Sequence, residues 1–399
     1  MKNIKIGFDR RNHHEIADIF NLYGEQYREH NSISCEQAKV MHHIQVCRTA
    51  ALGGHVEQCN ECGYEKIAYN SCRNRHCPKC QTMTKEKWLN ARKAELLPCG
   101  YFHLVFTLPH TLNPIILCNK KTMLTILFAS VNATLQAFAK DPQWRLNGQL
   151  GIIAVLHTWS QTLLDHFHLH CLVPAGALSS VHNKWNPTRK NFLFQIKSLA
   201  KGYRKQYLHK LNSAYQQKKL IFPGKTASIG SQKIFEEMTE NLSKIDWIAY
   251  AKRPFAGPEQ VLEYLGRYTH RIAISNNRLI SIGKKQVIFT YSDRKNDNEK
   301  KTMTLDAEEF IRRFLLHVLP KGFMKIRYFG FLSDVKKKKC IQLIRQLLNH
   351  IVKLPDQVKE TVQQIMQRIT GIDITCCPKC KKGKMITVKE LPRPVWNTS

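Results

Sequence analysis

Acidic side chains are scarce in this sequence. Its 399 residues contain 30 Asp and Glu but 62 Lys and Arg, so the formal net charge is +32. The basic residues are spread along the chain rather than confined to one tail. Because such an excess attracts negative charge over much of the surface, we expect the partner to be a polyanion.

A long apolar run is also missing. The N-terminal residues contain no apolar signal core, and the longest uncharged stretch, residues 122–139, is interrupted by Thr, Ser, Asn and Gln. Leu124, Leu127, Val131 and Leu135 recur in it at helical spacing, which predicts a buried amphipathic helix rather than a membrane span. With 43% hydrophobic residues and no internal repeat of domain size, the chain is expected to form two or three globular domains.

The 14 cysteines gather mainly toward the two ends of the chain. Without an export signal they indicate metal binding rather than disulfides, because the cytoplasm keeps thiols reduced. Cys59-x-x-Cys62 and Cys77-x-x-Cys80 have the spacing of two loops that present four thiolates to one zinc ion. The alternative interpretation is a set of reduced core cysteines. Residues 12–50 before them are expected to form two helices, the second opened by a capping box at Ser34.

Other side chains could add to the zinc sites. Four candidates could hold a second ion or replace one of the four thiols: Cys72, His76, His55 and Cys47. The tail contains Cys377-x-x-Cys380, half of a zinc site, to which Cys376 or Cys340 could add a third ligand. Free thiols are the alternative for the tail. Lysines and arginines lie close to the two N-terminal Cys-x-x-Cys loops. A closed zinc site formed by these loops is therefore expected to stabilise a basic surface that binds nucleic acid.

Residues 165–173 read DHFHLHCLV. In a strand, His166, His168 and His170 share one face, while the residues between them point into a core. Histidines at alternate positions are often only surface residues on the solvated face of a strand. Here, however, the neighbouring predicted strand, 151–159, contains His157 as well. We therefore expect a divalent-metal site with at least two imidazole ligands and open positions for phosphate and water.

A second cluster of functional groups lies in the segment YLGRYTHRI. At helical spacing Tyr264, Tyr268 and Arg271 line up on one face, with Arg267 slightly further round. Tyrosines four residues apart most often serve packing, but Gly266 between them is typical of a close approach by another backbone or a ligand. Beside a metal site, a tyrosine can attack a phosphodiester, and the arginines can hold phosphates.

Three motifs in order carry a family resemblance: CRNRHCPKCQ, HFHLHCLVPAG and YLGRYTHRIAISNNRL. The chain resembles transposases of the insertion-sequence-91 type, the rolling-circle transposases of the HUH superfamily that use two tyrosines. The resemblance runs from about residue 15 to about residue 335. It implies an α+β protein with an N-terminal helical and zinc-binding domain over residues 1–99. An HUH-type catalytic domain, a central antiparallel sheet flanked by helices, would follow over residues 100–293, and a C-terminal region over residues 294–399.

The resemblance also implies an activity. Such enzymes nick and rejoin single-stranded DNA at element ends and at the target, with Mg²⁺ or Mn²⁺ and a 5′-phosphotyrosine intermediate, in the bacterial cytoplasm at the nucleoid. The metal-binding pair matches His168 and His170, and the nucleophiles match Tyr264 and Tyr268. His166 belongs to the family pattern as a further candidate ligand, and Gln161 follows it as a candidate third ligand.

The sequence departs from the family pattern in three segments, HTWSQ (157–161), LPHTL (108–112) and DHFHLH (165–170), and other functions stay open. Thr111 stands where Glu is common and offers no ligand group. A replication initiator or relaxase with the same chemistry is one alternative, and a non-catalytic zinc-dependent regulator is another. Further along, Asn276-Asn277 predicts a hairpin turn, 286–291 a strand, 294–301 a polar linker and 302–320 a helix. The run Lys336–Lys339 predicts a solvated face that could contact DNA.

Overall fold

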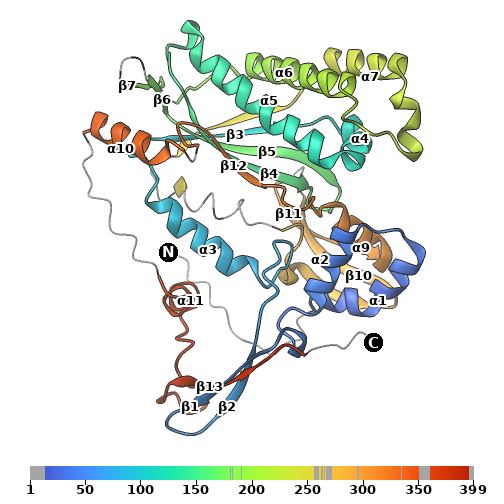
Figure 1. The fold of residues 1–399 in the computed structure, drawn as a ribbon, viewed down its shortest axis with the longest axis vertical. Coiled ribbons are helices and arrows are strands. Elements are labelled where there is room, and N and C mark those ends of the chain that lie inside the picture. The colour runs from blue at the N-terminus through green and yellow to red at the C-terminus, as the bar shows by residue number, and fades with distance from the viewer. Residues whose placement is uncertain are drawn as a thin grey trace.

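The computed structural model describes residues 14–179, 181, 183–189, 191–255, 260–261, 264, 266, 272–293, 296–333, 335–349 and 360–394. Within these residues every pair of neighbouring strands is antiparallel and helices lie between the sheets, which confirms the predicted α+β class. Five strands form the central sheet (Figure 1). In sheet order they are β12 (Ile326–Gly330), β4 (Gly151–Trp159), β5 (Asp165–Pro174), β3 (Tyr101–Thr107) and β8 (Ala249–Phe255).

A layer of helices covers one face of this sheet (Figure 1). Its members are α4 (Asn113–Cys118), α5 (Lys120–Lys140), α6 (Ile196–Gln216) and α7 (Gln232–Lys244). The periodic leucines and valine of residues 122–139 are buried in the shared core, as predicted. Among the described helices α5 alone has the length and composition to cross a membrane, but 56% of its apolar window is buried inside the protein. A small hairpin of β6 (Gly176–Ser179) and β7 (Lys184–Pro187) lies beside the layer.

A second core joins the N-terminal helices to a three-stranded sheet. Phe20 on α1 meets Phe314 on α9 edge to face, with ring centroids 5.4 Å apart. The predicted capping box is present, because Ser34 Oγ accepts from the Gln37 amide and the Gln37 side chain accepts from the Ser34 amide. The elements of this unit are α1 (Ile16–His30), α2 (Cys35–Gln45), β9 (Leu279–Gly283), β10 (Gln286–Asp293), β11 (Glu299–Asp306) and α9 (Ala307–Leu316).

Two local predictions in this region are wrong. Asn276 and Asn277 form a short 3₁₀ helix, Asn276–Arg278, and the hairpin turn lies instead between β9 and β10 at Lys284 and Lys285. Residues 296–298 of the expected linker form the turn before β11. The rest of it, 299–301, and the start of the expected helix, 302–306, form β11 itself. Residues 301–305 alternate between half-buried and exposed positions, and this period of two belongs to a strand.

The two ends of the chain meet in a third sheet. Strand β1 (Gly54–Cys59) pairs on one side with β2 (Glu65–Tyr69) and on the other with β13 (Met385–Leu391). Helix α3 (Gln81–Lys93) leads from this sheet toward the central one, and α11 (Val362–Thr370) lies against it (Figure 1). The lysine run opens α10 (Lys337–Leu347), where the Lys337 ammonium is 2.7 Å from a carboxylate oxygen of Glu95.

Candidate active site and cysteine clusters

The register of the central sheet gathers the histidines on one face. His168 of β5 stands opposite His157 of β4 on one side and Thr107 of β3 on the other. Directly paired residues of antiparallel strands point to the same face. The intervening Phe167 and Leu169 are buried in the core beneath the helix layer, so the predicted division of this strand into a polar and an apolar face is confirmed.

Three imidazoles form a compact cluster at this face. The nearest ring nitrogens of His157, His168 and His170 all lie within 4.8 Å of one another. His166 is not part of this group. Its ring stacks on that of His110 with centroids 5.5 Å apart, and its centroid lies 4.6 Å from that of His168. Gln161 lines the same cavity as His168 and His170. The structure therefore brings the predicted pair together and adds His157 as the third member.

Hydrogen bonds fix how these rings can present lone pairs. His168 Nδ1 is 2.8 Å from the carbonyl oxygen of His166, which can only accept, so Nδ1 carries the proton and Nε2 is left with a lone pair. His168 Nε2 in turn lies 3.1 Å from His170 Nε2. When His170 has its proton on Nδ1, two lone pairs face each other at this distance, and a metal cation satisfies both. The donor set thus fits an ion held by imidazole nitrogens.

A fourth histidine connects this cluster to the tyrosine. His103 Nε2 of β3 is 2.9 Å from His170 Nδ1, and the Tyr264 hydroxyl lies 2.8 Å from His103 Nδ1 and 2.6 Å from His103 Nε2. Burial, reinforced by the charge of Lys252, lowers the pKa of His103 to about 3, so the ring stays neutral at physiological pH. An imidazole that ligates through Nε2 keeps its proton on Nδ1. With His170 in that state, His103 accepts at Nε2 and donates Nδ1–H to the tyrosine oxygen.

Sequence reasoning did not single out His103. Its sequence context, the apolar run YFHLVFTL, is typical of a core strand with one buried polar residue. The other predicted groups of the tyrosine segment, Tyr268, Arg267 and Arg271, lie outside the described residues. Gly266 does mark a close approach, since a Cβ added there would lie 3.0 Å from Leu89 Cδ1 on α3.

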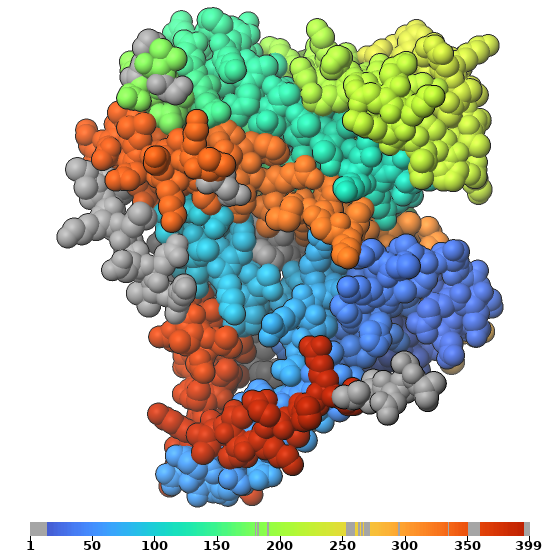
Figure 2. Space-filling model, in the orientation of Figure 1, coloured from blue at the N-terminus to red at the C-terminus, as the bar shows by residue number. Residues whose placement is uncertain are grey.

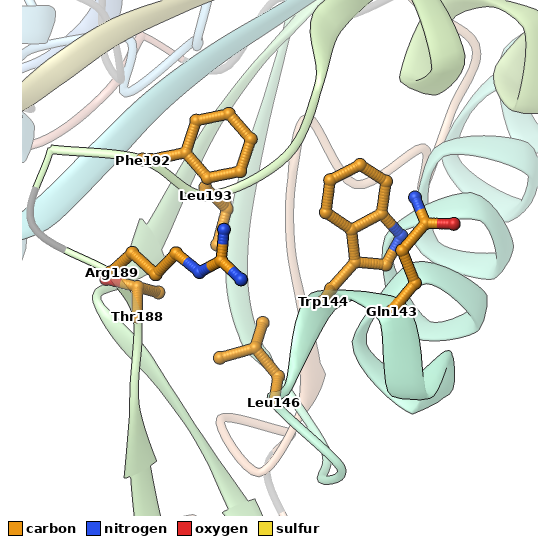
Figure 3. A pocket seen from close by; sticks show the side chains of 7 residues that line it. All are labelled: Gln143, Trp144, Leu146, Thr188, Arg189, Phe192 and Leu193. Carbon is orange, nitrogen blue, oxygen red and sulfur yellow. The ribbon is translucent and has the colours of Figure 1, made fainter.

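A cavity of about 510 Å³ opens over these groups. Its wall is polar and comes from three strands of the central sheet, the tyrosine segment and the β10–β11 hairpin. The lining residues are His103, Val105, Thr107, Gln161, His166, His168, His170, Tyr250, Lys252, Tyr264, Ser292 and Asn298. By contrast, the hollow between Trp144, Arg189 and Phe192 (Figure 3) holds about 10 Å³, roughly the space of one water molecule. The histidine cavity has room for a substrate. A cavity of about 480 Å³ between α5 and α6 has similar room, but neither the imidazole cluster nor Tyr264 lines it.

The cysteines form two separate clusters of four. The first contains Cys47, Cys72, Cys77 and Cys80, and the second contains Cys59, Cys62, Cys377 and Cys380. The spacing predicted that Cys59 and Cys62 share one zinc site with Cys77 and Cys80, but the structure places the two pairs in different clusters. Cys59 and Cys62 lie at the tip of the β1–β2 hairpin, whereas Cys47 and Cys72 flank its open end, and a strand of five or six residues separates these ends by about 17–20 Å.

The other candidate zinc ligands lie elsewhere. His76 is buried beside Arg75 and Lys325, and its burial lowers the pKa of the imidazole to about 3. His55 Nε2 is 3.2 Å from a carboxylate oxygen of Glu57. Neither Cys340 nor Cys376 belongs to a group of ligands among the described residues. Both four-cysteine clusters have the composition of a closed structural zinc site.

Comparison with known proteins identifies the class. A family described as "Transposase zinc-binding domain" matches residues 19–108, and one described as "Putative transposase" matches residues 151–339. The first range contains the whole first cysteine cluster, and the second contains the predicted metal pair and the tyrosine. The protein is thus a transposase, a class of enzymes that process DNA, with a zinc-binding domain at its N-terminal end.

Full-length relatives narrow this class. The chain is 44% identical over 393 residues to a "Putative transposase y4qJ" of Sinorhizobium fredii, covering 96% of this chain and 98% of that protein. It is 30% identical over 294 residues to the transposase for insertion sequence element IS801 of Pseudomonas savastanoi pv. phaseolicola, covering 72% and 68% respectively. The chain belongs to the transposases of the insertion-sequence-91 type, as the sequence motifs predicted. No solved structure matches the chain.

Proposed function

We propose that this transposase cuts and rejoins single-stranded DNA at the ends of its element through a phosphotyrosine formed on Tyr264. One observation carries the proposal: the Tyr264 hydroxyl is hydrogen-bonded through His103 to the imidazole cluster, inside a cavity with room for a substrate. The imidazole cluster and the Tyr264 hydroxyl are thereby close enough to act on the same phosphate. A cavity of this size suits an extruded or single-stranded nucleotide better than a duplex.

We assign a separate role in this reaction to the three clustered histidines, His103 and Tyr264. His157, His168 and His170 would hold one divalent ion, and such an ion would supply Lewis-acid polarisation of the scissile phosphate. Neutral His103 donates a hydrogen bond to the Tyr264 oxygen and so favours its phenolate form. Tyr264 gives its proton to water, and the phenolate attacks phosphorus. A Tyr–O–P bond forms, the bond from phosphorus to the 3′ oxygen breaks, and that oxygen takes up a proton from water. A free 3′ hydroxyl can later attack the phosphotyrosine and restore the phosphodiester.

Tyr268 would serve as the second nucleophile, with Arg267 and Arg271 binding phosphates. These three roles rest on the motif YLGRYTHR and its helical spacing. The chromosomal substrate lies in the bacterial cytoplasm, where thiols stay reduced and available as zinc ligands. The ion itself is expected to be Mn²⁺ more readily than Mg²⁺, because Mg²⁺ strongly prefers oxygen ligands and the site offers three imidazoles.

The test is capture of the covalent adduct. The protein is incubated with a labelled single-stranded element end and Mn²⁺ or Mg²⁺, then denatured and resolved by electrophoresis. We expect an adduct that is more abundant with Mn²⁺, lost with EDTA, and absent from the double variant Tyr264→Phe, Tyr268→Phe. Tyr69→Phe, on the exposed strand β2, is the matched control and should form the adduct normally.

Two outcomes would overturn the proposal. An adduct that survives the double substitution would show that another residue is the nucleophile. Normal DNA binding with no adduct under any condition, unchanged in His168→Ala plus His170→Ala, would indicate a non-catalytic regulator. A replication initiator with the same chemistry would nick the strand but would fail to join an element end to a second DNA, so strand transfer is scored in the same reaction.

A further inference from the structure

The second cysteine cluster joins parts of the chain that lie more than 300 residues apart. Cys59 Sγ is 3.7 Å from Cys380 Sγ, and Cys62 Sγ is 3.7 Å from Cys377 Sγ. Four sulfurs arranged tetrahedrally around zinc at about 2.3 Å are separated by about 3.8 Å. A disulfide needs about 2.05 Å. The observed spacing is therefore that of ligands around one ion.

The backbone around these sulfurs is shaped for thiolates. The amides of Glu61 and Cys62 point at Cys59 Sγ at 3.5 Å, and the amide of Gly383 points at Cys380 Sγ at 3.3 Å. Such N–H donors favour the charged form of the sulfur. A Cβ at Gly383 would lie 2.5 Å from Cys59 Sγ, so only glycine lets the two loops approach this closely.

The sheet holds the two loops in register. Strands β1 and β13 pair up to the site itself, where Cys59 stands opposite Met385. Beyond them, Asn60 and Lys384 exchange two hydrogen bonds, of 3.1 Å between backbone groups and 2.7 Å to the Asn60 side chain. Four lysines in the tail loop offset the negative charge of four thiolates: Lys379, Lys381, Lys382 and Lys384. Figure 2 shows the C-terminal residues in red lying against the N-terminal ones in blue at this end of the molecule.

Neither matched family region contains the whole cluster. The zinc-binding domain match ends at residue 108 and the transposase match at residue 339, so Cys377 and Cys380 lie outside both. We propose that Cys59, Cys62, Cys377 and Cys380 bind a second structural zinc ion, which fastens residues 360–391 onto the zinc-binding domain. The first ion, at the other four cysteines, is a separate site at the far end of the β1–β2 hairpin.

The C-terminal segment, residues 360–391, contacts α3, the helix that packs against the tyrosine segment, YLGRYTHRI. Arg368 of α11 lies 3.1 Å from a carboxylate oxygen of Glu86 on α3, and Glu360 is hydrogen-bonded to Asn90 on the same helix. Leu89 of α3 meets the tyrosine segment at Gly266, so the segment held by the second zinc contacts the same helix that packs against the tyrosine segment. Loss of the second zinc is therefore expected to loosen the tail first.

Counting the zinc ions bound per chain tests the proposed second site directly and requires no DNA substrate. The full-length protein, purified with reducing agent and without chelator, should contain two zinc ions per chain by plasma mass spectrometry. Cys377→Ser plus Cys380→Ser should contain one, and so should Cys59→Ser plus Cys62→Ser. Cys376→Ser, which removes the neighbouring thiol outside the cluster, is the matched control and should keep two.

A second measurement guards against variants that simply misfold. Hydrogen exchange should rise strongly in β13 and α11 of the two double variants, while the core strands β4 and β5 stay protected. Cys380→His, which restores a ligand of another type, should keep two zinc ions and a protected β13. Two zinc ions in both double variants, one in the unaltered protein, or iron in place of zinc would each overturn the proposal.

Discussion

His103 is the residue whose role can be tested most sharply. In His103→Leu the tyrosine loses its hydrogen-bond donor, so its phenolate is less favoured. We expect slower adduct formation at neutral pH and a rate profile whose rising limb moves upward by about 0.5–1 pH unit, the equivalent of one neutral hydrogen bond. His103→Gln retains an N–H donor and should recover part of the shift. Rates measured at saturating DNA and Mn²⁺ between pH 6 and 10 decide this; an unshifted profile in His103→Leu contradicts it.

Single histidines also make stability depend on pH. His317 is fully buried, donates from Nε2 to the Leu163 carbonyl at 3.0 Å, and its burial lowers the pKa to about 4 from an ordinary 6.5. The unfolded chain therefore binds this proton first as the pH falls. Stability from the neutral ring is complete above pH 6.5 and declines between pH 6.5 and 4, by about 3 kcal/mol in all.

His317→Gln removes this titration. The variant is expected to be less stable than the parent at pH 7.5, and the difference should shrink steadily as the pH falls toward 4. Urea unfolding followed by fluorescence at several pH values measures it. A difference that stays constant with pH would contradict the assigned titration, and His209→Gln on α6 provides a control at a histidine with no such hydrogen bonds to the core.

Individual site residues could be predicted from the sequence only where a pattern repeats. His168 and His170 could be assigned because alternate positions of a strand share a face. His103 and His157 could not be ranked, since their importance depends on β3 and β4 lying on either side of β5, and this order is set by long-range pairing. His76 looked like a zinc ligand by proximity in sequence, but its ring turns toward Arg75 and Lys325 instead.

At the scale of elements, the β9–β10 hairpin offers a stability test. Its two turn residues, Lys284 and Lys285, have φ of 49° and 59°, a left-handed conformation that lysine adopts at a cost. Replacing them by Asn and Gly, the pair preferred in such turns, should raise the free energy of unfolding by about 1 kcal/mol. The midpoint in urea measures this, with Lys336→Asn outside the turn as the control. Unchanged or reduced stability would contradict the turn geometry.

The same hairpin shows why turns were harder to predict than strands. The Asn-Asn pair carried the residue signal for a turn, but the strand partners on either side determine where the chain reverses. The polar stretch 294–301 was interpreted as a linker because of its charges. Met303 and Leu305, which alternate with exposed residues in β11, were assigned to the helix expected over residues 302–320. Residue preference is weak where pairing with β10 supplies the stability.

At the scale of the whole molecule, the cysteines show what spacing can and cannot specify. Each Cys-x-x-Cys pair does form half of a cluster, because two residues of separation suffice to bring both sulfurs to one point. Which halves combine depends on a hairpin that moves Cys59 away from Cys77, and on a C-terminal strand that returns to β1 after more than 300 residues. Local spacing contains no information about that return.

The net charge of +32 leads to a prediction about how DNA is held. Among the described residues that line the cavity, Lys252 is the one fixed cation, so we expect further phosphate contacts from other basic residues, Arg267 and Arg271 among them. Each neutralised phosphate of a single strand contributes about −0.7 to the slope of log affinity against log salt. Binding should therefore show a slope of several units, and Lys252→Gln should reduce it by about 0.7.

The chemical step should respond to salt differently. The reacting groups are enclosed by His103 and the imidazole cluster, and buried interactions are screened far less than exposed ones. At DNA concentrations that saturate the protein at every salt level, adduct formation should change little between 50 and 300 mM potassium chloride, although the apparent affinity falls steeply. Parallel titrations of binding by fluorescence anisotropy and of adduct rate separate the two effects. A rate that falls with salt as steeply as the affinity would mean that surface charges, and not the buried histidines, position the scissile phosphate.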